Sequence, residues 1–491
     1  MKISFLFYFS IYFSLSFLLI VSSSKKVKNS KNKQELKSKE KLKYDDISSI
    51  YHWGQKNGIY INNNLQLYKN SENDLNHNFY YFKTNKTIKN NSLLLSVPSS
   101  IMISQESLEK MHKKGKNKKL ANLWNKVINI NKYLNYSSSK QLFYISVMLS
   151  DATFKQKGKF YKKYEEYLNM YDYINLDDYP IFFKANEVVY LNSSNFGKEI
   201  INNYKAINNE YDLINHELEM DSTVIVEEFI KYRILSIANS IYYKNKSYIV
   251  PFIDCFQKKV NLTHKEYNAY VRLNISNQSN HGFNINIYTN RTIKKNKEIS
   301  ILWKLVSNIE NYLYYGFVDE NNMIIPPYLV EFVNKNFLKD LNVDLVNKKN
   351  KINFEDLIEP KYYDLSDYSF DRHLLDKYRN YSLYFDKYSH SNEGPYVMMK
   401  DNLQYYLDIY KELYNDELIN RNIEGINKKK YVRNVLNMER KLIEEKINAL
   451  EAQIVDIANN KEERDIYELL RRSFYQQQKN KKKFKMILYA Y

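Results

Sequence analysis

The scarcity of glycine is the feature that most limits what this chain can fold into. Only 9 of its 491 residues are glycine and 7 are proline, so few positions can adopt the left-handed backbone that tight turns need. This excludes collagen-like, Gly/Ser-linker and Pro-rich architectures. Glycine-rich phosphate loops are expected to be scarce as well. The single cysteine, Cys255, excludes an intrachain disulfide and a cysteine-based zinc site.

The charge of the chain limits its possible partners less than the total suggests. Lys plus Arg is 74 and Asp plus Glu is 56, a formal net charge of +18. Lysine, asparagine and tyrosine are frequent along the whole chain, which is typical of an AT-rich genome and needs no polyanionic partner. Neither a zinc-finger spacing nor an aromatic RNA-binding motif is present, so we expect no specific nucleic-acid partner. The 8 histidines include no close ligand pair, and we expect no metal site.

The N-terminal residues are typical of a targeting signal. After Lys2, residues 3–21 contain only Ile, Ser, Phe, Leu, Tyr and Val, which predicts a secretory signal peptide over residues 1–23. The alternative is an uncleaved signal anchor, because about 20 apolar residues can span a bilayer. Such an anchor would be the chain's predicted contact with a membrane. Residues 24–45 are rich in lysine and lack apolar periodicity, so we predict a disordered basic leader there.

The hydrophobic pattern of the remaining chain predicts an α+β protein. Short apolar segments predict strands at 93–103, 248–256, 283–288 and 299–303. Phe283, Ile285 and Ile287 alternate with polar residues, as a strand with one buried face requires. Apolar residues at helical spacing predict helices over 120–168, over 221–242 and after Pro327. The pair Pro326-Pro327 is a plausible domain boundary.

The clearest helical periodicity lies near the C-terminus. Four apolar residues follow one another at intervals of seven: Leu436, Ile443, Leu450 and Ile457. Residues 426–475 contain neither Gly nor Pro, so a long helix with one apolar stripe is predicted. The stripe suits packing inside a helical domain and also suits an intermolecular coiled coil, which three heptads can support only weakly.

Three segments carry recognisable motifs: residues 53–58 (WGQKNG) with 94–98 (LLSVP), residues 248–254 (YIVPFID), and residues 293–318. In sequence and in order along the chain, they resemble the SET-domain methyltransferases of the Rubisco large-subunit methyltransferase type. The third segment is the most specific. Its Glu298-Ile is followed by a predicted strand, then by Ser307-Asn-Ile-Glu and Tyr315-Gly-Phe-Val, the order in which the family has these motifs.

The resemblance covers about residues 46–470 and implies an α+β fold with a SET-like β core and a pseudo-knot. In the family, a helical insert splits this core and a helical substrate-binding domain follows it. We accordingly predict the two parts of the core at 46–104 and 243–325, the helical insert at 105–242, and an all-helical domain at 326–491.

The resemblance also implies where a cofactor would bind. Family members transfer a methyl group from S-adenosylmethionine to a lysine, or in some cases a histidine, of a protein. The family's Gly-x-Gly cofactor strand falls on Phe79 and Tyr81, two bulky rings. Its cofactor-binding Asn-His pair, which follows Asp254, falls on Gln257 and Lys258. An insertion after Asp254 would shift that pair to the alternative positions of Asn261 and His264.

The catalytic positions that the resemblance implies are altered too. The family's catalytic tyrosine falls on Trp303, and the glycine after it falls on Lys304. An indole has a donor N–H but no hydroxyl, so it cannot accept a proton or a hydrogen bond from a substrate amine. Tyr315 falls on the family's second active-site tyrosine, and we favour a packing role for it because the catalytic residues expected around it are replaced.

These substitutions favour a catalytically degenerate, protein-binding relative of the methyltransferases, with no cofactor expected. The alternative is an active S-adenosylmethionine-dependent protein-lysine (or histidine) N-methyltransferase whose divergence hides its motifs. In either case the partner or substrate is a protein whose identity the sequence does not give.

The signal and basic leader together resemble the bipartite address of proteins sent to the relict plastid (apicoplast) of apicomplexan parasites. The alternative is residence in the secretory pathway, with residues 24–45 serving as a linker. A fluorescent protein fused to residues 1–60 tests this address, and we expect label in the plastid. Label retained in the endoplasmic reticulum would contradict the plastid address.

Overall fold

The computed structural model describes residues 46–69, 80–113, 123–129, 137–155, 158–173, 176–217, 226–259, 267–275, 282–303, 306–319, 329–331, 362–364, 378, 382, 388 and 393–459. The predicted signal peptide and leader lie outside these residues. The chain divides into two compact units: unit 1 is Met1–Val188 with Glu199–Ile324, and unit 2 is Val189–Lys198 with Ile325–Tyr491. No helix in the described part of the chain has the length and apolarity needed to cross a membrane.

A six-stranded sheet forms the centre of unit 1. Its strands, in spatial order, are β1 (Tyr60–Ile61), β4 (Leu93–Pro98), β10 (Phe283–Thr289), β9 (Ala269–Ile275), β11 (Ser300–Leu302) and β8 (Gln257–Lys259). Strand β11 runs parallel to both of its neighbours, whereas the other pairs are antiparallel. Phe283, Ile285 and Ile287 are all buried on β10, which confirms the predicted alternation.

Two smaller sheets complete the strands of unit 1. Strands β2 (Leu65–Lys69) and β3 (Tyr80–Thr84) form a hairpin, and β7 (Lys246–Ile249) lies between β5 (Ile103–Ser104) and β6 (Ser240–Tyr243). The strand predicted at 248–256 is wrong beyond Ile249. Pro251 has no N–H for a ladder, and Phe252 has a left-handed backbone with φ 65°. The chain therefore turns through the short helix η5 (Ile253–Cys255) before it enters β8.

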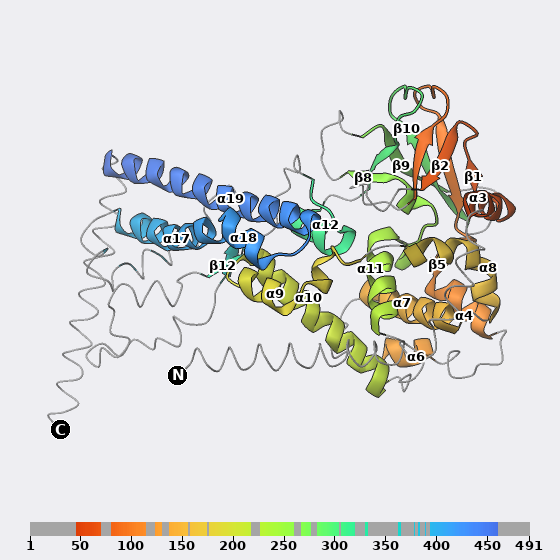
Figure 1. The fold of residues 1–491 in the computed structure, drawn as a ribbon, viewed down its shortest axis with the longest axis horizontal. Helices are drawn as coiled ribbons and strands as arrows, with labels where there is room; N and C mark the ends of the chain where they lie inside the picture. The colour runs from red at the N-terminus through yellow and green to blue at the C-terminus, as the bar shows by residue number, and fades with distance from the viewer. Residues whose placement is uncertain are drawn as a thin grey trace. The chain divides into compact units, whose positions relative to one another are not determined.

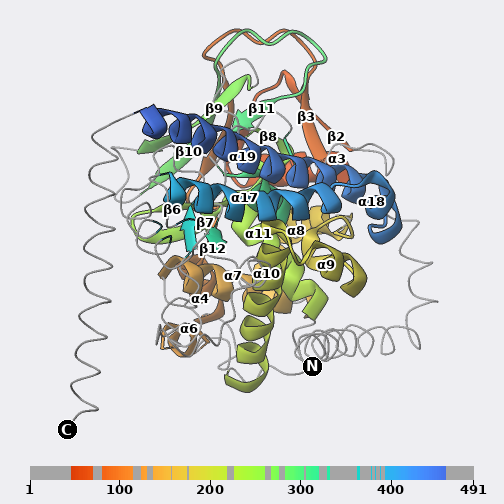
Figure 2. The same cartoon turned by 90° about the vertical axis from the view of Figure 1, so that its left-hand side faces the viewer.

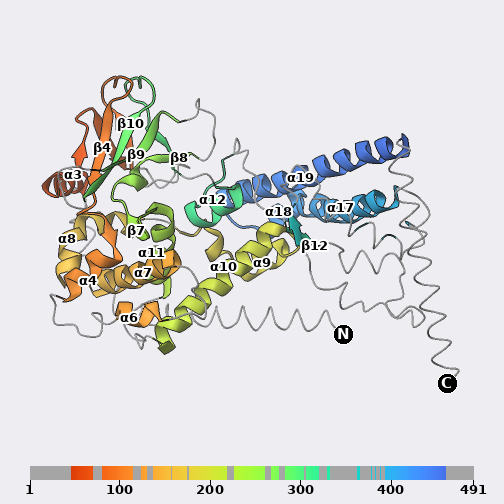
Figure 3. The same cartoon turned by 180° about the vertical axis from the view of Figure 1, so that it is seen from behind.

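Helices occupy most of the described chain between β5 and β6. They are α4 (Gln105–Lys113), α6 (Leu123–Ile128), α7 (Ser137–Lys155), α8 (Gly158–Asn169), η2 (Met170–Tyr173), η3 (Pro180–Phe182), α9 (Ala185–Leu191), α10 (Asn195–Asp212), η4 (Leu213–Glu217) and α11 (Val226–Asn239). Helix α3 (Asp46–Lys56) packs against β1 and β2, and α12 (Asn308–Tyr315) packs against α11 and η3. Within unit 1, β4, β9 and β10 lie together, and α4, α6 and α7 lie at the opposite end (Figure 1 and, from behind, Figure 3).

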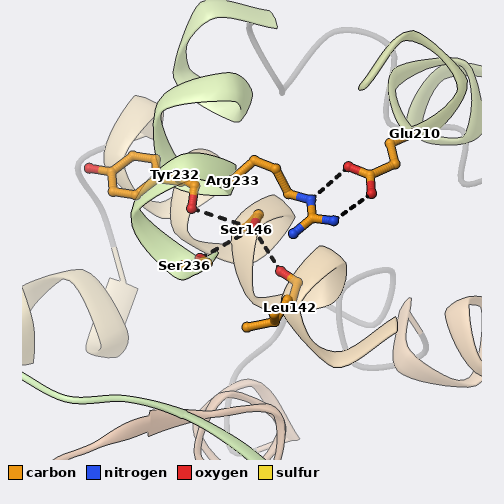
Figure 4. A network of polar contacts seen from close by, with 6 residues as sticks. All are labelled: Leu142, Ser146, Glu210, Tyr232, Arg233 and Ser236. Atoms are coloured by element: carbon orange, nitrogen blue, oxygen red, sulfur yellow. Dashed lines mark hydrogen bonds and ion pairs between the residues drawn. The ribbon is translucent and has the colours of Figure 1, made fainter. Parts of the chain in front are cut away.

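A buried polar network joins three helices of unit 1 (Figure 4). The Ser146 hydroxyl of α7 bonds to the Leu142 carbonyl at 2.6 Å and to the Ser236 hydroxyl of α11 at 3.2 Å. Also on α11, Arg233 donates two hydrogen bonds to Glu210 of α10, at 2.8 and 2.7 Å. These side chains fix the position of α11, whose C-terminal end reaches the strands.

The Trp-Gly pair at the start of unit 1 packs against segments that are distant in sequence. The Trp53 ring stacks on Tyr167 with centroids 5.5 Å apart, and its indole N–H donates to the Lys163 carbonyl at 2.7 Å. A Cβ on Gly54 would lie 2.9 Å from the ring of Phe252. Glycine is therefore needed here for the close approach of an aromatic ring.

Unit 2 is helical in its described part apart from one small sheet. Helices α17 (Gly394–Leu413) and α19 (Ile426–Asn459) run side by side with α18 (Asp416–Asn422) between them in sequence (Figure 2). The stripe at Leu436, Ile443, Leu450 and Ile457 is buried, so packing inside the chain accounts for it. The antiparallel pair β12 (Leu329–Glu331) and β13 (Tyr362–Asp364) is a departure from the predicted all-helical domain.

A buried carboxyl group links two helices within unit 2. Glu439 on α19 is 3% exposed, and its Oε1 accepts a hydrogen bond at 3.0 Å from the backbone N–H of Phe196, in the first turn of α10. Burial raises the pKa of Glu439 from 4.5 to about 8. The carboxyl is therefore mainly protonated in the folded protein at neutral pH.

Removing one member of the buried pair Arg233–Glu210 should destabilise unit 1 strongly. The change Glu210→Ala leaves an uncompensated guanidinium, and we expect a loss of about 3–5 kcal/mol in the free energy of unfolding. The exposed pair Lys246–Glu106, at 2.5 Å, offers the control: Glu106→Ala should cost about 0–1 kcal/mol. Urea titration of both variants checks the difference, and equal losses would contradict the importance of the buried pair.

Glu439 should make the stability of unit 2 depend on pH. Its folded pKa is raised, so the free energy of unfolding should fall between about pH 4.5 and pH 8, where only the unfolded chain releases the proton. The total fall is on the order of 5 kcal/mol. Glu439→Gln should abolish it, whereas Glu445→Gln, at an exposed position on the same helix, should not. Parallel pH profiles of the wild type and Glu439→Gln would contradict the assignment.

Candidate functional site

Two aromatic residues singled out in the sequence, Trp303 and Tyr315, lie beside the buried ammonium group of a third, Lys258. Lys258 lies on β8 and is 8% exposed. Its Nζ lies 5.9 Å from the centroid of the Trp303 ring and 5.1 Å from that of Tyr315. Because aromatic faces carry partial negative charge, both rings stabilise the cation. The tertiary structure therefore brings together a lysine, an indole and a phenol that are distant in sequence.

The end of helix α11 supplies the hydrogen-bond acceptors for this ammonium. Lys258 Nζ donates to the carbonyl of Ala238 at 3.3 Å and to the side-chain oxygen of Asn239. A buried charge without such partners would cost several kcal/mol. The last carbonyls of a helix also carry partial negative charge, which favours a cation at this position. The buried charge of Lys258 is therefore balanced by two hydrogen-bond acceptors and by the end of a helix.

Trp303 is fixed by the same helix end. Its indole N–H donates to the carbonyl of Ala238 at 2.9 Å, so one carbonyl accepts from both Trp303 and Lys258. The hydrogen bond to Ala238 and the Lys258 ammonium over the ring together hold the indole in a defined orientation. An indole has no lone pair for an incoming amine, and its one donor is already engaged.

Tyr315 is positioned by the caps of a short helix. Ser307 and Glu310 form a capping box at the start of α12, and Gly316 ends the helix with φ 75°. The carbonyl of Tyr315 accepts a hydrogen bond from the Tyr179 hydroxyl at 3.1 Å. A Cβ on Gly316 would lie 2.6 Å from the Tyr179 ring. Burial raises the pKa of the Tyr315 phenol above its ordinary value, so the hydroxyl stays protonated.

A second buried polar group lies one turn before β8. The Tyr171 hydroxyl donates to a carboxyl oxygen of Asp254 and contacts the Tyr167 hydroxyl. Burial raises the pKa of Asp254, and the hydrogen bond from Tyr171 and the charge of Lys258 partly offset the rise. These contacts link the turn before β8 to α8 and η2 of the helical insert. Tyr167 in turn stacks on Trp53 of α3.

The other sequence-predicted positions lie elsewhere or outside the described residues. Tyr81 on β3 stacks on Tyr68, with ring centroids 5.8 Å apart. Gln257 lines a surface hollow of about 670 Å³. The positions outside the described residues are Phe79, Lys304, Asn261 and His264. In the described part of the chain, no group of three or more His, Cys, Asp or Glu residues could bind a metal ion.

Sequence reasoning missed the acceptors on which this site depends. Ala238 and Asn239 lie about 20 positions before Lys258 and 65 before Trp303, at the end of a predicted helix. No spacing rule pairs a helix end with a strand at that distance. The sequence carried no signal for this site, since Lys258 lies in the polar strand Gln257–Lys259 and has the pattern of an ordinary exposed lysine.

The comparisons with known proteins agree with the fold that the motifs implied. No protein-family model and no curated protein matches the sequence. Among solved structures, the SET domain of LSMT bound to lysine and AdoHcy is similar, with a TM-score of 0.55 and 14% identity, covering 86% of this chain and 95% of that one. Rubisco LSMT bound to AdoMet gives a TM-score of 0.53 and 13% identity, covering 87% and 96%.

The chain therefore has the SET methyltransferase fold of the LSMT type, with a helical C-terminal region. The α+β class and the resemblance found in the sequence are confirmed at the level of the fold.

Proposed function

We propose that this protein is a catalytically degenerate, protein-binding member of the LSMT-type SET fold. The observation that carries the proposal is the buried ammonium of Lys258, which contacts Trp303 and Tyr315. By the alignment, these three residues stand at a cofactor-binding position, the catalytic tyrosine position and the second active-site tyrosine. The lysine and the tryptophan, with Ala238 and Asn239, form a closed set of contacts of their own.

The residues at the aligned cofactor positions do not fit S-adenosylmethionine. That cofactor carries a sulfonium cation, and Lys258 places a second buried cation at the position where the family has a histidine. Two unit charges 4 Å apart repel by about 4 kcal/mol at an effective dielectric constant near 20. A repulsion of that size weakens binding by roughly a thousandfold.

The residue at the aligned catalytic position does not fit the transfer step. Methyl transfer to an amine requires the nucleophile to lose its proton, so the family's phenol is a group that can accept a hydrogen bond. Trp303 offers one N–H, which the Ala238 carbonyl occupies. Tyr315 keeps a hydroxyl, but burial raises its pKa and disfavours the phenolate. The surrounding frame, from the capping box of α12 to the turn at Gly316, supports a folded domain independently of catalysis.

Calorimetric titration of S-adenosylmethionine into the full-length protein tests the proposal. We expect no binding heat at millimolar cofactor, because the Lys258 ammonium and the sulfonium repel each other. Rubisco LSMT, titrated in the same buffer, serves as the positive control. Micromolar binding to this protein, or transfer of a labelled methyl group to any protein substrate, would overturn the proposal in favour of the active methyltransferase.

Two matched variants separate charge from shape in this experiment. Lys258→Met and Lys231→Met each remove the ammonium of a lysine that is 8% exposed, but only Lys258 contacts Trp303 and Tyr315. We expect cofactor affinity to become measurable in Lys258→Met and to stay undetectable in Lys231→Met. An equal effect in both variants would show that the ammonium of Lys258 is not what excludes the cofactor.

A further inference from the structure

A polar hollow of about 670 Å³ lies on the surface of unit 1, beside β8 and the turn between β10 and β11. None of its lining residues is aromatic, and one is aliphatic. They are Lys83, Gln257, Asn268, Arg291, Thr292, Ile293, Lys294, Asn296, Lys297, Glu298 and Ser300. The hollow is distinct from the Lys258 cluster, although Gln257 and Lys258 are neighbours on β8.

The lining of this hollow carries an excess of positive charge. Its four cations are Lys83, Arg291, Lys294 and Lys297, and its one acid is Glu298, so the lining has a net charge of 4 − 1 = +3. Glu298 is engaged by Lys83 at 3.7 Å. Among the described residues, the other three cations make no ion pair, and all three are exposed. These three exposed cations are therefore available to an anion from outside the chain.

The backbone that carries these cations is tightly held. The Thr84 hydroxyl, which is buried, donates to the Lys294 carbonyl at 2.7 Å and accepts from the Lys297 N–H at 3.1 Å. The Thr84 carbonyl accepts from the Asn296 N–H at 2.7 Å. A mutual pair of hydrogen bonds joins Ile88 to Ile293 at 2.9 and 2.8 Å. The turn is therefore ordered before any ligand arrives, which lowers the entropy cost of binding.

We propose that this hollow binds an acidic, Asp- or Glu-rich segment of a protein partner; this rests on the proposed protein-binding function and names its partner chemistry. Arginine and lysine side chains donate charge-assisted hydrogen bonds to carboxylates, and the amide of Gln257 adds a neutral donor. The absence of aromatic rings from the lining favours a peptide, because single-stranded nucleic acid is bound by stacking its bases on aromatic side chains.

Binding of a labelled peptide to the full-length protein tests this site. The probe is a fluorescent twelve-residue peptide that alternates Glu and Gly, and the control peptide has Gln in place of each Glu. We expect the Glu peptide to raise the fluorescence anisotropy at micromolar protein and the Gln peptide not to. The double variant Lys294→Glu/Lys297→Glu should weaken binding by about tenfold or more, because it reverses two charges that face the ligand.

A second double variant controls for the net charge of the whole protein. Lys56→Glu/Lys205→Glu makes the same change in net charge at exposed positions on α3 and α10, outside the hollow, and should alter binding less than twofold. Equal weakening by both double variants, or no binding of the Glu peptide, would overturn the site. Displacement of the labelled peptide by single-stranded RNA at lower concentrations than the unlabelled Glu peptide requires would overturn the site in favour of nucleic acid. Displacement by inorganic phosphate at those lower concentrations would overturn it in favour of a small-anion site.

These outcomes are independent of the cofactor titration. Peptide binding is measured without S-adenosylmethionine, so cofactor binding would overturn the degenerate assignment and leave the hollow intact. Failure of the peptide to bind would remove the partner chemistry and leave the cofactor result unchanged.

Discussion

The ammonium group of Lys258 imposes the constraint on which the arrangement of the SET core depends. A cation inside a protein requires acceptors on several sides, and here they come from the end of α11 and from two aromatic rings. The carbonyl of Ala238 also accepts the Trp303 indole N–H. Helix α11 must therefore end at one defined place, which the Arg233–Glu210 pair and the Ser146–Ser236 contact help to fix.

The frame around this cluster is held by contacts within the chain. The capping box of Ser307 and Glu310, and the left-handed turn at Gly316, are needed for α12 to form and pack. They stabilise the domain whether or not a cofactor binds. Lys258 and Trp303 complete the packing between β8, β11 and α11 with contacts that use their own donors, so no ligand is required to satisfy them.

Local patterns predicted much of this fold because they reflect periodic burial. The alternation at Phe283, Ile285 and Ile287 predicted β10, and the apolar residues at intervals of seven from Leu436 predicted α19. The segment 248–256 failed as one strand because its apolar composition suits a strand, while Pro251 and the left-handed Phe252 turn the backbone. The β12–β13 pair was missed because two three-residue strands have no periodicity to detect.

The sequence by itself determined the fold class and the order of the SET motifs, and it directed attention to Gln257, Lys258 and Trp303. Each of these follows from residue identity and local spacing. Only the tertiary structure decided what Lys258 contacts, that Ala238 serves two donors, and that Lys83 lies in one hollow with Arg291 and Lys297. The reason is physical: hydrogen bonds and charge pairing depend on distances across strands and helices, which no pattern along a single chain contains.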